Sequence, residues 1–466
     1  MRATALAVAL ALLVAAPLQA AQPTRIDQPS LDRAAALRTQ ALADPTAWQV
    51  LESLTTEVGP RMAGSEADAR AVEWARAKFK ALGYDRVWTE PVTFPKWERR
   101  SEAARVLGAH AQPLRVTALG GSPAGTVEGE VVRFADLAAL QAAPDGSLAG
   151  KIAFVDYPMQ ARADGSDYRN GGGIRWAGPS LAVHKGAIGF LMRSAGTDTS
   201  RAAHTGGTRF EEGLKPIPAA ALSTIDAAQL ARLAALGPTR VQLALDCGWD
   251  GQYTSQNVIG EITGSKRPQE IVLIGGHLDS WDLGTGAIDD GAGIAITMAT
   301  GALLKPLKPA RSIRVVAFAN EEQGLWGGRA YMQKHAGDVG KHIIAVESDF
   351  GADHIYGFDS SARDLQPAAL AQIQQVLAPL GISWMPGKGE PESDIGPLTE
   401  RGMAWAWLGH DGTRYFDLHH NAEDTLDKIN PQSLAQNTAA YAVFTWLAAQ
   451  ADGDFGSAPK PPSAGK

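Results

Sequence analysis

The pattern of apolar and polar positions divides the chain into regions of different periodicity. Residues 66–82 carry apolar side chains at helical spacing, with Ser65 as a candidate N-cap and Gly83 as a candidate stop. Between Thr126 and about Trp249, short apolar runs typical of strands dominate and helical patterns are few. This change predicts a separate, β-rich domain inserted into the first one.

From Asn257 onward, strand patterns alternate with helical ones. Continuous apolar runs at 271–276, 312–319 and 342–347 predict strands buried on both faces by helices. A further helix is expected after Asn430 as N-cap and Pro431 as first residue. The predicted fold class is therefore α/β, with a sheet sandwiched between helices and an inserted β-rich domain.

The two ends of the chain differ in composition from the rest. Residues 1–21 combine Arg2, an apolar run and small residues, as secretory signal peptides do. The run is shorter than the roughly 20 residues that a membrane span needs, and no later segment is expected to span one. The tail at 453–466 is rich in Gly, Pro and Ser and is predicted to be disordered. The mature protein is thus expected to be exported, periplasmic or secreted, and free of the membrane.

These assignments give a predicted domain order. A first part of the catalytic domain covers 22–125, the insert 126–250 and the second part 251–452. The formal charge of −7 is spread over both signs without a basic block, which argues against a nucleic-acid partner. The single cysteine, Cys247, lies in a strand-like run and is predicted to be a small buried hydrophobe.

The stretch GGHLDSWDLGTGAIDDGAG, residues 275–293, raises the question of a metal. It places four aspartates beside one histidine, and such carboxylates repel one another unless a cation lies among them. Histidine or carboxylate side chains also follow the next two predicted strands and recur in HHNAEDT near the C-terminus. Since ligands bind at the carboxyl ends of strands in α/β sheets, these residues are expected to meet.

Histidine and carboxylates without cysteine suit Zn²⁺ or another divalent metal, and two metals need a bridging carboxylate. Simpler interpretations exist for single motifs. Asp290 is expected to cap the following helix, and NEEQG alone is typical of a solvated loop. Other histidines, such as His184, His204 and His410, are predicted to be structural or on the surface.

Together these motifs resemble the di-zinc exopeptidases of the bacterial leucyl aminopeptidase and glutamate carboxypeptidase family. The long string at 275–293 and VGPRMAGSEADARAVEWA most resemble its plasma glutamate carboxypeptidase (carboxypeptidase Q) branch. LAGKIAFVDY and AVHKGAIGFLMRSAG, within the insert, resemble a protease-associated domain. The resemblance covers almost all of the mature chain and implies the zinc exopeptidase fold, with a mixed sheet.

The resemblance also implies residue roles. One zinc site would consist of His277, Asp289 and Asp349, and the other of Asp289, Glu322 and His420.

Three further residues would act beside these ligands. Glu321 matches the general base, and Asp279 matches the acid that orients His277. His419 takes a position where some relatives hold a tyrosine that steadies the oxyanion, so it is a candidate substrate-binding donor.

The implied function is a zinc-dependent metallo-exopeptidase that hydrolyses dipeptides or short peptides with free termini. An aminopeptidase of the same family is the main alternative. A one-zinc glutaminyl cyclase and a non-catalytic binding protein fit less well, because all five ligands and the base are present. The resemblance further implies a homodimer.

Overall fold

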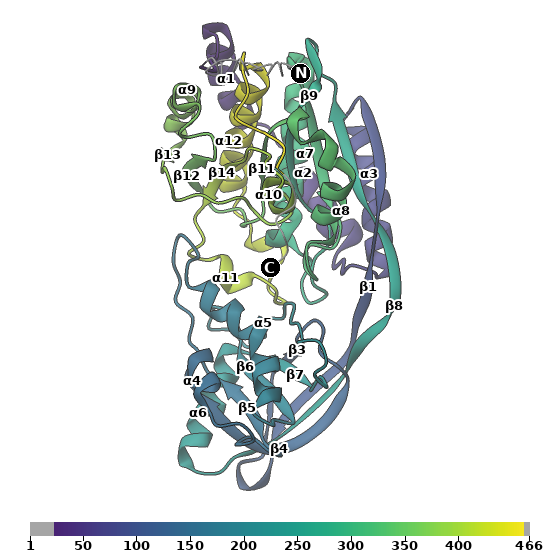
Figure 1. Cartoon of the computed structure of the whole chain (residues 1–466), viewed down its shortest axis with the longest axis vertical. Helices are drawn as coiled ribbons and strands as arrows, with labels where there is room; N and C mark the ends of the chain where they lie inside the picture. Colours follow the sequence, from purple (N-terminus) through teal and green to yellow (C-terminus); the bar gives the residue numbers. More distant parts are fainter. Residues whose placement is uncertain (1–22, 461–466) are drawn as a thin grey trace, which may run out of the picture.

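The computed structural model describes residues 23–460, so the predicted signal peptide lies outside the described part of the chain. The molecule has two lobes joined by a long two-stranded ribbon (Figure 1). The upper lobe contains both chain ends of the described part. The lower lobe is formed by the insert.

The upper lobe is built on the mixed sheet that the apolar runs predict. Its strand order is β11-β9-β10-β8, with β1 on the far side of β8; β9 is parallel to β10 and β11, and β8 is antiparallel to β10. The strands are β1 (Arg86–Val106), β8 (Arg240–Ile262), β9 (Arg267–His277), β10 (Arg311–Phe318) and β11 (His342–Glu347). Alternate residues of β9 face opposite helical layers: Val272 and Ile274 belong to one core cluster, Ile271 and Leu273 to another. Burial on both faces explains the unbroken apolar runs.

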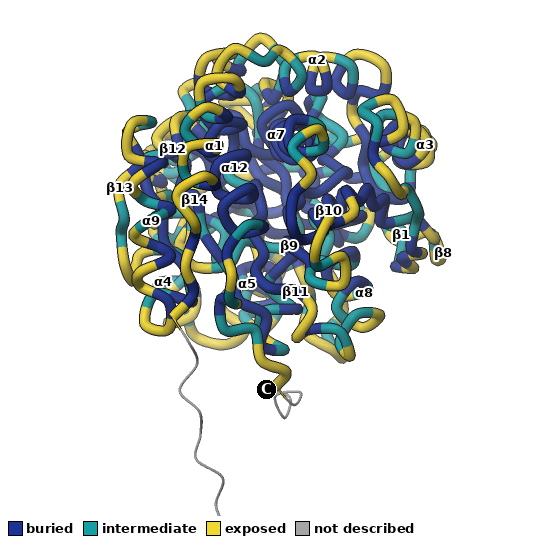
Figure 2. The backbone as a smooth tube through the Cα atoms, turned by 90° about the horizontal axis from the view of Figure 1, so that it is seen from above, coloured by how far each residue is buried: buried dark blue, intermediate teal, exposed yellow. Residues whose placement is uncertain are grey.

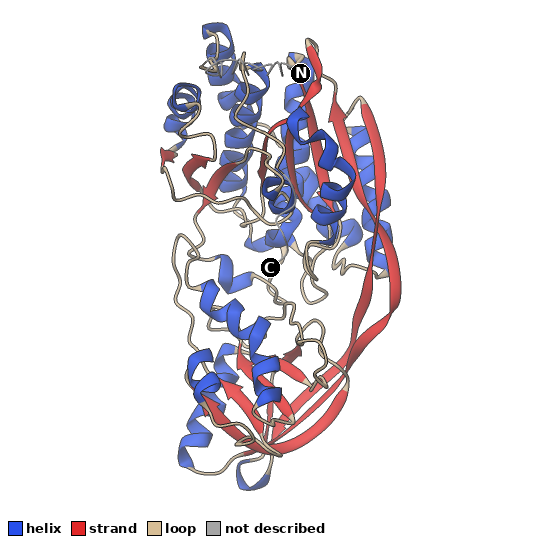
Figure 3. Ribbon diagram, viewed as in Figure 1, coloured by secondary structure: helices blue, strands red, loops and turns tan. Residues whose placement is uncertain are grey.

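Helices cover both faces of this sheet (Figure 3). On one face the core cluster contains residues of α1 (Gln28–Ala41), α2 (Thr46–Ser53), α3 (Glu66–Ala81), α7 (Ala292–Leu304) and α12 (Pro431–Gln450). The opposite cluster contains residues of α8 (Trp326–His335) and α10 (Gly396–Glu400). The predicted caps are confirmed: the Ser65 side chain accepts from Asp68 N, and that of Asn430 from Gln432 N and Ser433 N.

A second, three-stranded sheet lies beside the main sheet. Its order is β13-β12-β14, and the isolated bridge between Ala345 and Trp405 ties this region to β11. The elements of this region are β12 (Ile355–Ser360), α9 (Pro367–Leu377), β13 (Ser383–Trp384), β14 (Ala406–His410) and α11 (Tyr415–Leu418).

The lower lobe continues the main sheet. Strands β1 and β8 pair from Arg86 opposite Glu261 to Val106 opposite Val241, and β8 then pairs with β4. Strands β4 to β7 run parallel, and β3 closes the edge antiparallel to β7. The strands are β2 (Gln112–Leu114), β3 (Val116–Ala118), β4 (Gly125–Phe134), β5 (Ile152–Val155), β6 (Gly189–Arg193) and β7 (Ala219–Leu222). The lobe thus includes β2 and β3, which precede the predicted border at residue 126.

The prediction of few helices in the insert is wrong. The lobe contains α4 (Leu137–Ala142), α5 (Tyr168–His184) and α6 (Thr224–Leu236). The sequence did not predict helix α5, YRNGGGIRWAGPSLAVH. It contains four glycines and Pro179, and these residues disfavour helices. Packing against the parallel strands overrides that weak propensity. Cys247, in contrast, is buried as predicted, and burial raises the pKa of its thiol to about 11.

A long apolar segment agrees with the expectation of no later membrane span, whereas the predicted disorder of the C-terminal tail needs correction. The segment Ala287–Leu307 is long and apolar enough to cross a membrane, but 94% of its apolar window is buried inside the protein. Figure 2 shows α7 and α12 as dark, buried tubes, so the segment containing α7 belongs to the core. The tail is packed as far as residue 460: Phe455 is fully buried, and the N–H groups of Ala458 and Lys460 donate to Gly402 O and Arg401 O.

Candidate metal centre

The predicted ligands meet at one edge of the main sheet. His277 is the last residue of β9, Glu321 and Glu322 follow β10, and Asp349 follows β11. Because these three strands are parallel neighbours, their carboxyl ends lie together. The structure brings the remaining predicted residues to the same place, namely Asp279, Asp289, His419 and His420.

Three of these residues, His277, Asp289 and Asp349, form a first compact group. His277 Nε2 lies 3.0 Å from Asp289 Oδ1 and 3.2 Å from Asp349 Oδ1. The side chains are 1–8% exposed. One imidazole nitrogen and two carboxylate oxygens at these distances form a ligand set suited to a divalent metal.

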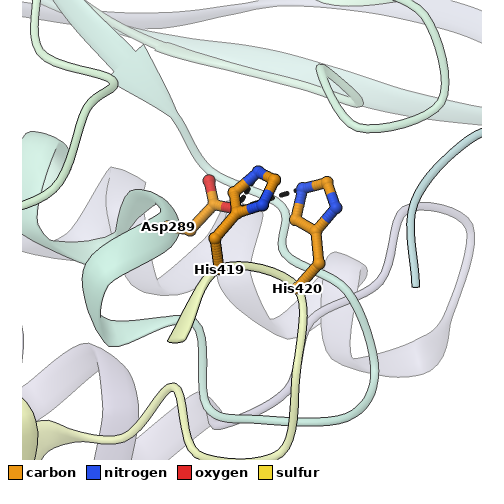
Figure 4. Close-up of side chains that lie close together, drawn as sticks. All are labelled: Asp289, His419 and His420. Carbon is orange, nitrogen blue, oxygen red and sulfur yellow. Dashed lines mark ion pairs between the residues drawn. The ribbon is translucent and has the colours of Figure 1, made fainter. Parts of the chain in front are cut away.

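The second group shares Asp289 with the first. His420 Nε2 lies 2.8 Å from Glu322 Oε2. It also lies 3.2 Å from Asp289 Oδ2 (Figure 4). Asp289 therefore presents one oxygen to each histidine, which is the arrangement of a bridging carboxylate. Asp289 Oδ2 and Glu322 Oε1 are buried and accept no hydrogen bond from the described residues. Such buried carboxylate oxygens fit a metal far better than a bare protein interior.

The buried ionisable groups of this centre shift one another's pKa values. Burial tends to lower the pKa of His277, but the charge of Asp349 and the contact with Asp289 raise it well above its usual value. Burial also opposes charge on His420, and Glu322 raises the pKa of His420 overall. The pKa of Asp289 is raised by burial but held well below its usual range by both histidines. Opposite charges at this centre thus stabilise one another.

His419 lies beside this centre. Its ring stacks on that of His420 with 3.5 Å between centroids, and its Nε2 lies 3.6 Å from Asp289 Oδ2. Burial, followed by the charge of His420, lowers the pKa of His419 well below its usual value, so its ring is neutral. Both histidines are close to Asp289, but His420 alone also contacts Glu322. This difference favours His420 as the ligand and leaves His419 as a neutral donor.

Asp279 lies beside His277 and contacts it through both its side chain and its backbone. Its carboxylate lies 3.7 Å from His277 Nδ1, whereas its backbone oxygen lies 3.0 Å from that nitrogen. The carboxylate accepts the N–H groups of Glu321 and Glu322, at 3.1 and 3.4 Å. Asp279 thus orients the histidine mainly through its carbonyl and fixes the Glu321–Glu322 backbone through its side chain.

Glu321 lines a cavity of about 310 Å³ together with four of the candidate ligands, Asp289, Glu322, Asp349 and His420. Its side chain makes no hydrogen bond to the described residues, and burial, followed by the charge of Asp349, raises its pKa well above its usual value. A carboxylate held free and with raised basicity beside a metal site is suited to proton transfer.

Two residues to which the sequence motifs gave no role hold the loop between β9 and α7. We call this segment, residues 278–291, the aspartate-rich loop. Arg61, fully buried, donates to the carbonyls of Leu278, Thr285 and Gly286. Asp424 accepts from the N–H groups of Ala287 and Ile288, at 2.8 and 2.6 Å, and thereby ties the C-terminal motif to the residues just before Asp289.

One loop glycine shows what these small residues do. Gly286 has φ of 60°, and a Cβ there would lie 2.4 Å from Ser280 Cβ and 2.7 Å from the Arg61 guanidinium. The absence of a side chain at Gly286 thus allows the loop to approach Arg61 and Ser280 closely. Asp290 caps α7 as predicted, because its Oδ1 accepts from Gly293 N.

The lower lobe contributes directly to the centre. Thr205 O lies 3.3 Å from His420 Nδ1, so it can accept from that nitrogen when Nε2 holds a metal. His204 Nδ1 lies 2.7 Å from His419 O, and Thr205 N donates to His420 O. Tyr168 and Arg175 of α5 line the same cavity as the metal ligands. His204 is structural, as predicted, but it acts on the ligand loop.

These lower-lobe residues were missed because no periodicity or motif marks them. No periodicity or motif marks Arg99 of β1 either. Arg99 is the partner of Asp282, one of the four aspartates in the 275–293 stretch. Its guanidinium forms a two-fold contact with the Asp282 carboxylate, 3.0 Å for each pair of atoms, and donates to Thr205 Oγ1. The aspartate-rich loop, the ribbon and the lower lobe therefore meet at one arginine.

Comparisons with known proteins identify relatives of the chain. Residues 257–445 match the model of "Peptidase family M28". Carboxypeptidase Q of Bos taurus is 32% identical over 87% of this chain and 86% of its own, and leucine aminopeptidase 2 of Arthroderma otae is 25% identical over 86% and 82%. The crystal structure of a peptidase M28 precursor from Shewanella amazonensis SB2B is 46% identical, with a TM-score of 0.90 over 93% of this chain and 99% of that one.

The fold and the site define a metallo-exopeptidase, as the sequence predicts. The chain belongs to peptidase family M28. The predicted mixed α/β fold is confirmed by the same relatives.

Proposed function

We propose that the protein is an exported di-zinc exopeptidase that hydrolyses dipeptides or short peptides with free termini. The observation that carries this proposal is the position of Asp289, whose two carboxylate oxygens face His277 and His420 separately. A shared carboxylate between two nitrogen-and-oxygen ligand sets suits a pair of Zn²⁺ ions. His277 and Asp349 would complete one site, and Glu322 and His420 the other.

Bound zinc supplies Lewis acidity, which polarises a peptide carbonyl and makes water more acidic. The residues of the chain then handle the proton. Glu321 accepts a proton from the attacking water and passes it to the leaving amine. His419, neutral and beside the ligands, donates a hydrogen bond to the oxygen of the tetrahedral intermediate.

The position of the lower lobe favours a small substrate. Tyr168 and Arg175 of the lower lobe line the same cavity of about 310 Å³ as Asp289, Glu322 and His420, so the lobe forms part of the wall of the site. Enclosure favours short chains, since a folded protein does not fit between the lobes. The carboxypeptidase Q relatives favour a carboxypeptidase or dipeptidase, and the leucine aminopeptidase relatives make aminopeptidase activity the alternative.

The cellular setting belongs to the same proposal. The apolar N-terminal run supports export to the periplasm or the medium, and the scattered charge supports a protein without nucleic-acid partners. A homodimer remains a proposal from family resemblance.

A substrate panel tests the specificity. We expect the zinc-loaded protein to cleave free dipeptides and short unblocked peptides and to leave intact proteins uncut. Product analysis by chromatography also shows which end is released first. Strong turnover of aminoacyl-p-nitroanilides without cleavage of dipeptides would assign the aminopeptidase alternative. Internal cleavage of denatured casein would contradict an exopeptidase.

The two neighbouring histidines are separable by mutation. His420→Ala removes a proposed ligand and should lose metal and activity together. His419→Ala should retain metal, with a reduction in kcat of about 10²- to 10³-fold, the range seen when one oxyanion donor is removed. Metal content and kcat are measured on the same preparations. Retention of metal by the His420 variant and its loss by the His419 variant would reverse the assignment.

A further inference from the structure

A second cavity, of about 350 Å³, lies next to the metal centre without sharing a lining residue with it. Gln323 and Gly324 line this cavity, whereas Glu321 and Glu322, directly before them, line the metal cavity. Its other walls come from the ribbon, the lower lobe and α8. We call it the tryptophan cavity, because four indole rings line it: Trp97, Trp176, Trp249 and Trp326.

The four rings are not equivalent. Trp97 is fully buried and donates to Ser122 O, and Trp326 donates to Gln323 O. Trp176 and Trp249 are 51% and 56% exposed. Large aromatic faces left in water beside a cavity are typical of ligand sites, since a planar group can stack on them.

The cavity is also positively charged. Arg209 and Arg329 line it, and neither side chain forms an ion pair or hydrogen bond with residues 23–460. No acidic side chain of the described chain lines it. The two guanidinium groups are therefore available to an anion, and guanidinium is well suited to binding a carboxylate in two-fold geometry.

Gln323 adds a neutral polar contact. Both polar atoms of its side-chain amide, Oε1 and Nε2, are buried and have no partner among the described residues. Burial of an unpaired amide is unfavourable, and a polar ligand that reaches Gln323 would relieve this cost.

From these features we propose that the tryptophan cavity binds a small aromatic carboxylate, with its ring among the indoles and its anion at Arg209 and Arg329. This site goes beyond the proposed peptidase activity and needs no metal. The ligand could be a free aromatic acid or the C-terminal aromatic residue of a peptide, because both carry the same ring and carboxylate.

Isothermal titration calorimetry with indole-3-acetate tests the proposal. We expect one binding site per chain, with the same affinity in zinc-loaded protein and in chelated protein whose folding is confirmed by circular dichroism. Indole-3-acetamide, the uncharged analogue, should bind more weakly. Gly-Gly-Trp, titrated into the chelated protein, binds more tightly than indole-3-acetate if the cavity takes peptide ends and more weakly if it takes free acids.

Variants locate the site. Trp249→Ala and Trp176→Ala should each weaken binding about tenfold or more, the usual effect of removing a stacking tryptophan. Arg209→Gln and Arg329→Gln should each weaken it about two- to fivefold, because exposed ion pairs contribute little. Leu236→Ala and Arg33→Gln, exposed residues of α6 and α1 outside the cavity, are the matched controls.

Three results would overturn the proposal. Loss of binding on chelation, in protein that stays folded, would place the ligand at the metal centre. Equal affinity for the acid and the amide would remove the role of the arginines. Unchanged binding in both tryptophan variants would place the ligand elsewhere. Failure of the peptidase proposal would instead appear in the substrate panel, without any effect on these titrations.

Discussion

Glu321→Gln should lower kcat by about 10²- to 10⁴-fold while metal content stays unchanged. The physical reason is that glutamine keeps the shape of the side chain but cannot accept a proton. Glu321 makes no side-chain hydrogen bond to the described residues and is not in contact with His277 or His420, so its replacement should leave both ligand sets intact. Steady-state kinetics and metal analysis of one preparation give both values.

The control is Glu400→Gln, an exposed glutamate at the end of α10 that touches no site residue. It should turn over peptides at the wild-type rate. Near-normal turnover by the Glu321 variant would show that another group takes the proton. A loss of metal in that variant would show instead that Glu321 is a ligand.

Asp289→Ala should empty both metal sites at once. Among residues 23–460, Asp289 is the one whose carboxylate lies within 3.2 Å of both His277 Nε2 and His420 Nε2. Its removal takes an oxygen from each ligand set. We expect metal content to fall well below one ion per chain and peptidase activity to disappear with it.

Inductively coupled plasma mass spectrometry of the dialysed protein gives the metal content. Asp364→Ala, an exposed aspartate outside the site, is the matched control and should bind metal like the wild type. Retention of full metal content by the Asp289 variant would refute the shared carboxylate. Loss of only one ion would show that Asp289 serves a single site.

The position of the lower lobe has consequences for both experiments. His204 and Thr205 hold the loop that carries His419 and His420, and Arg99 joins Asp282 to Thr205. The metal centre is therefore assembled by both lobes. Changes in the lower lobe, far along the chain from the ligands, should alter metal affinity as well as substrate access.

The sequence by itself indicated where the candidate metal ligands gather. Unbroken apolar runs predict strands buried on both faces, and the carboxyl ends of neighbouring parallel strands must share an edge, so His277, Glu322 and Asp349 could be placed together from their spacing alone. Ser65 and Asn430 marked helix starts because capping depends on local chain geometry.

Only the tertiary structure showed which distant segments of the chain pack together around the site. Helix α5 has a glycine-rich sequence with weak helix propensity, and its packing on the lower sheet makes it helical and brings Arg175 to the metal centre. The contacts of Arg61 with the aspartate-rich loop and of Thr205 with His420 join residues more than 200 positions apart. No local pattern encodes such pairs, because burial and hydrogen bonding at these sites depend on which surfaces the folded chain places side by side.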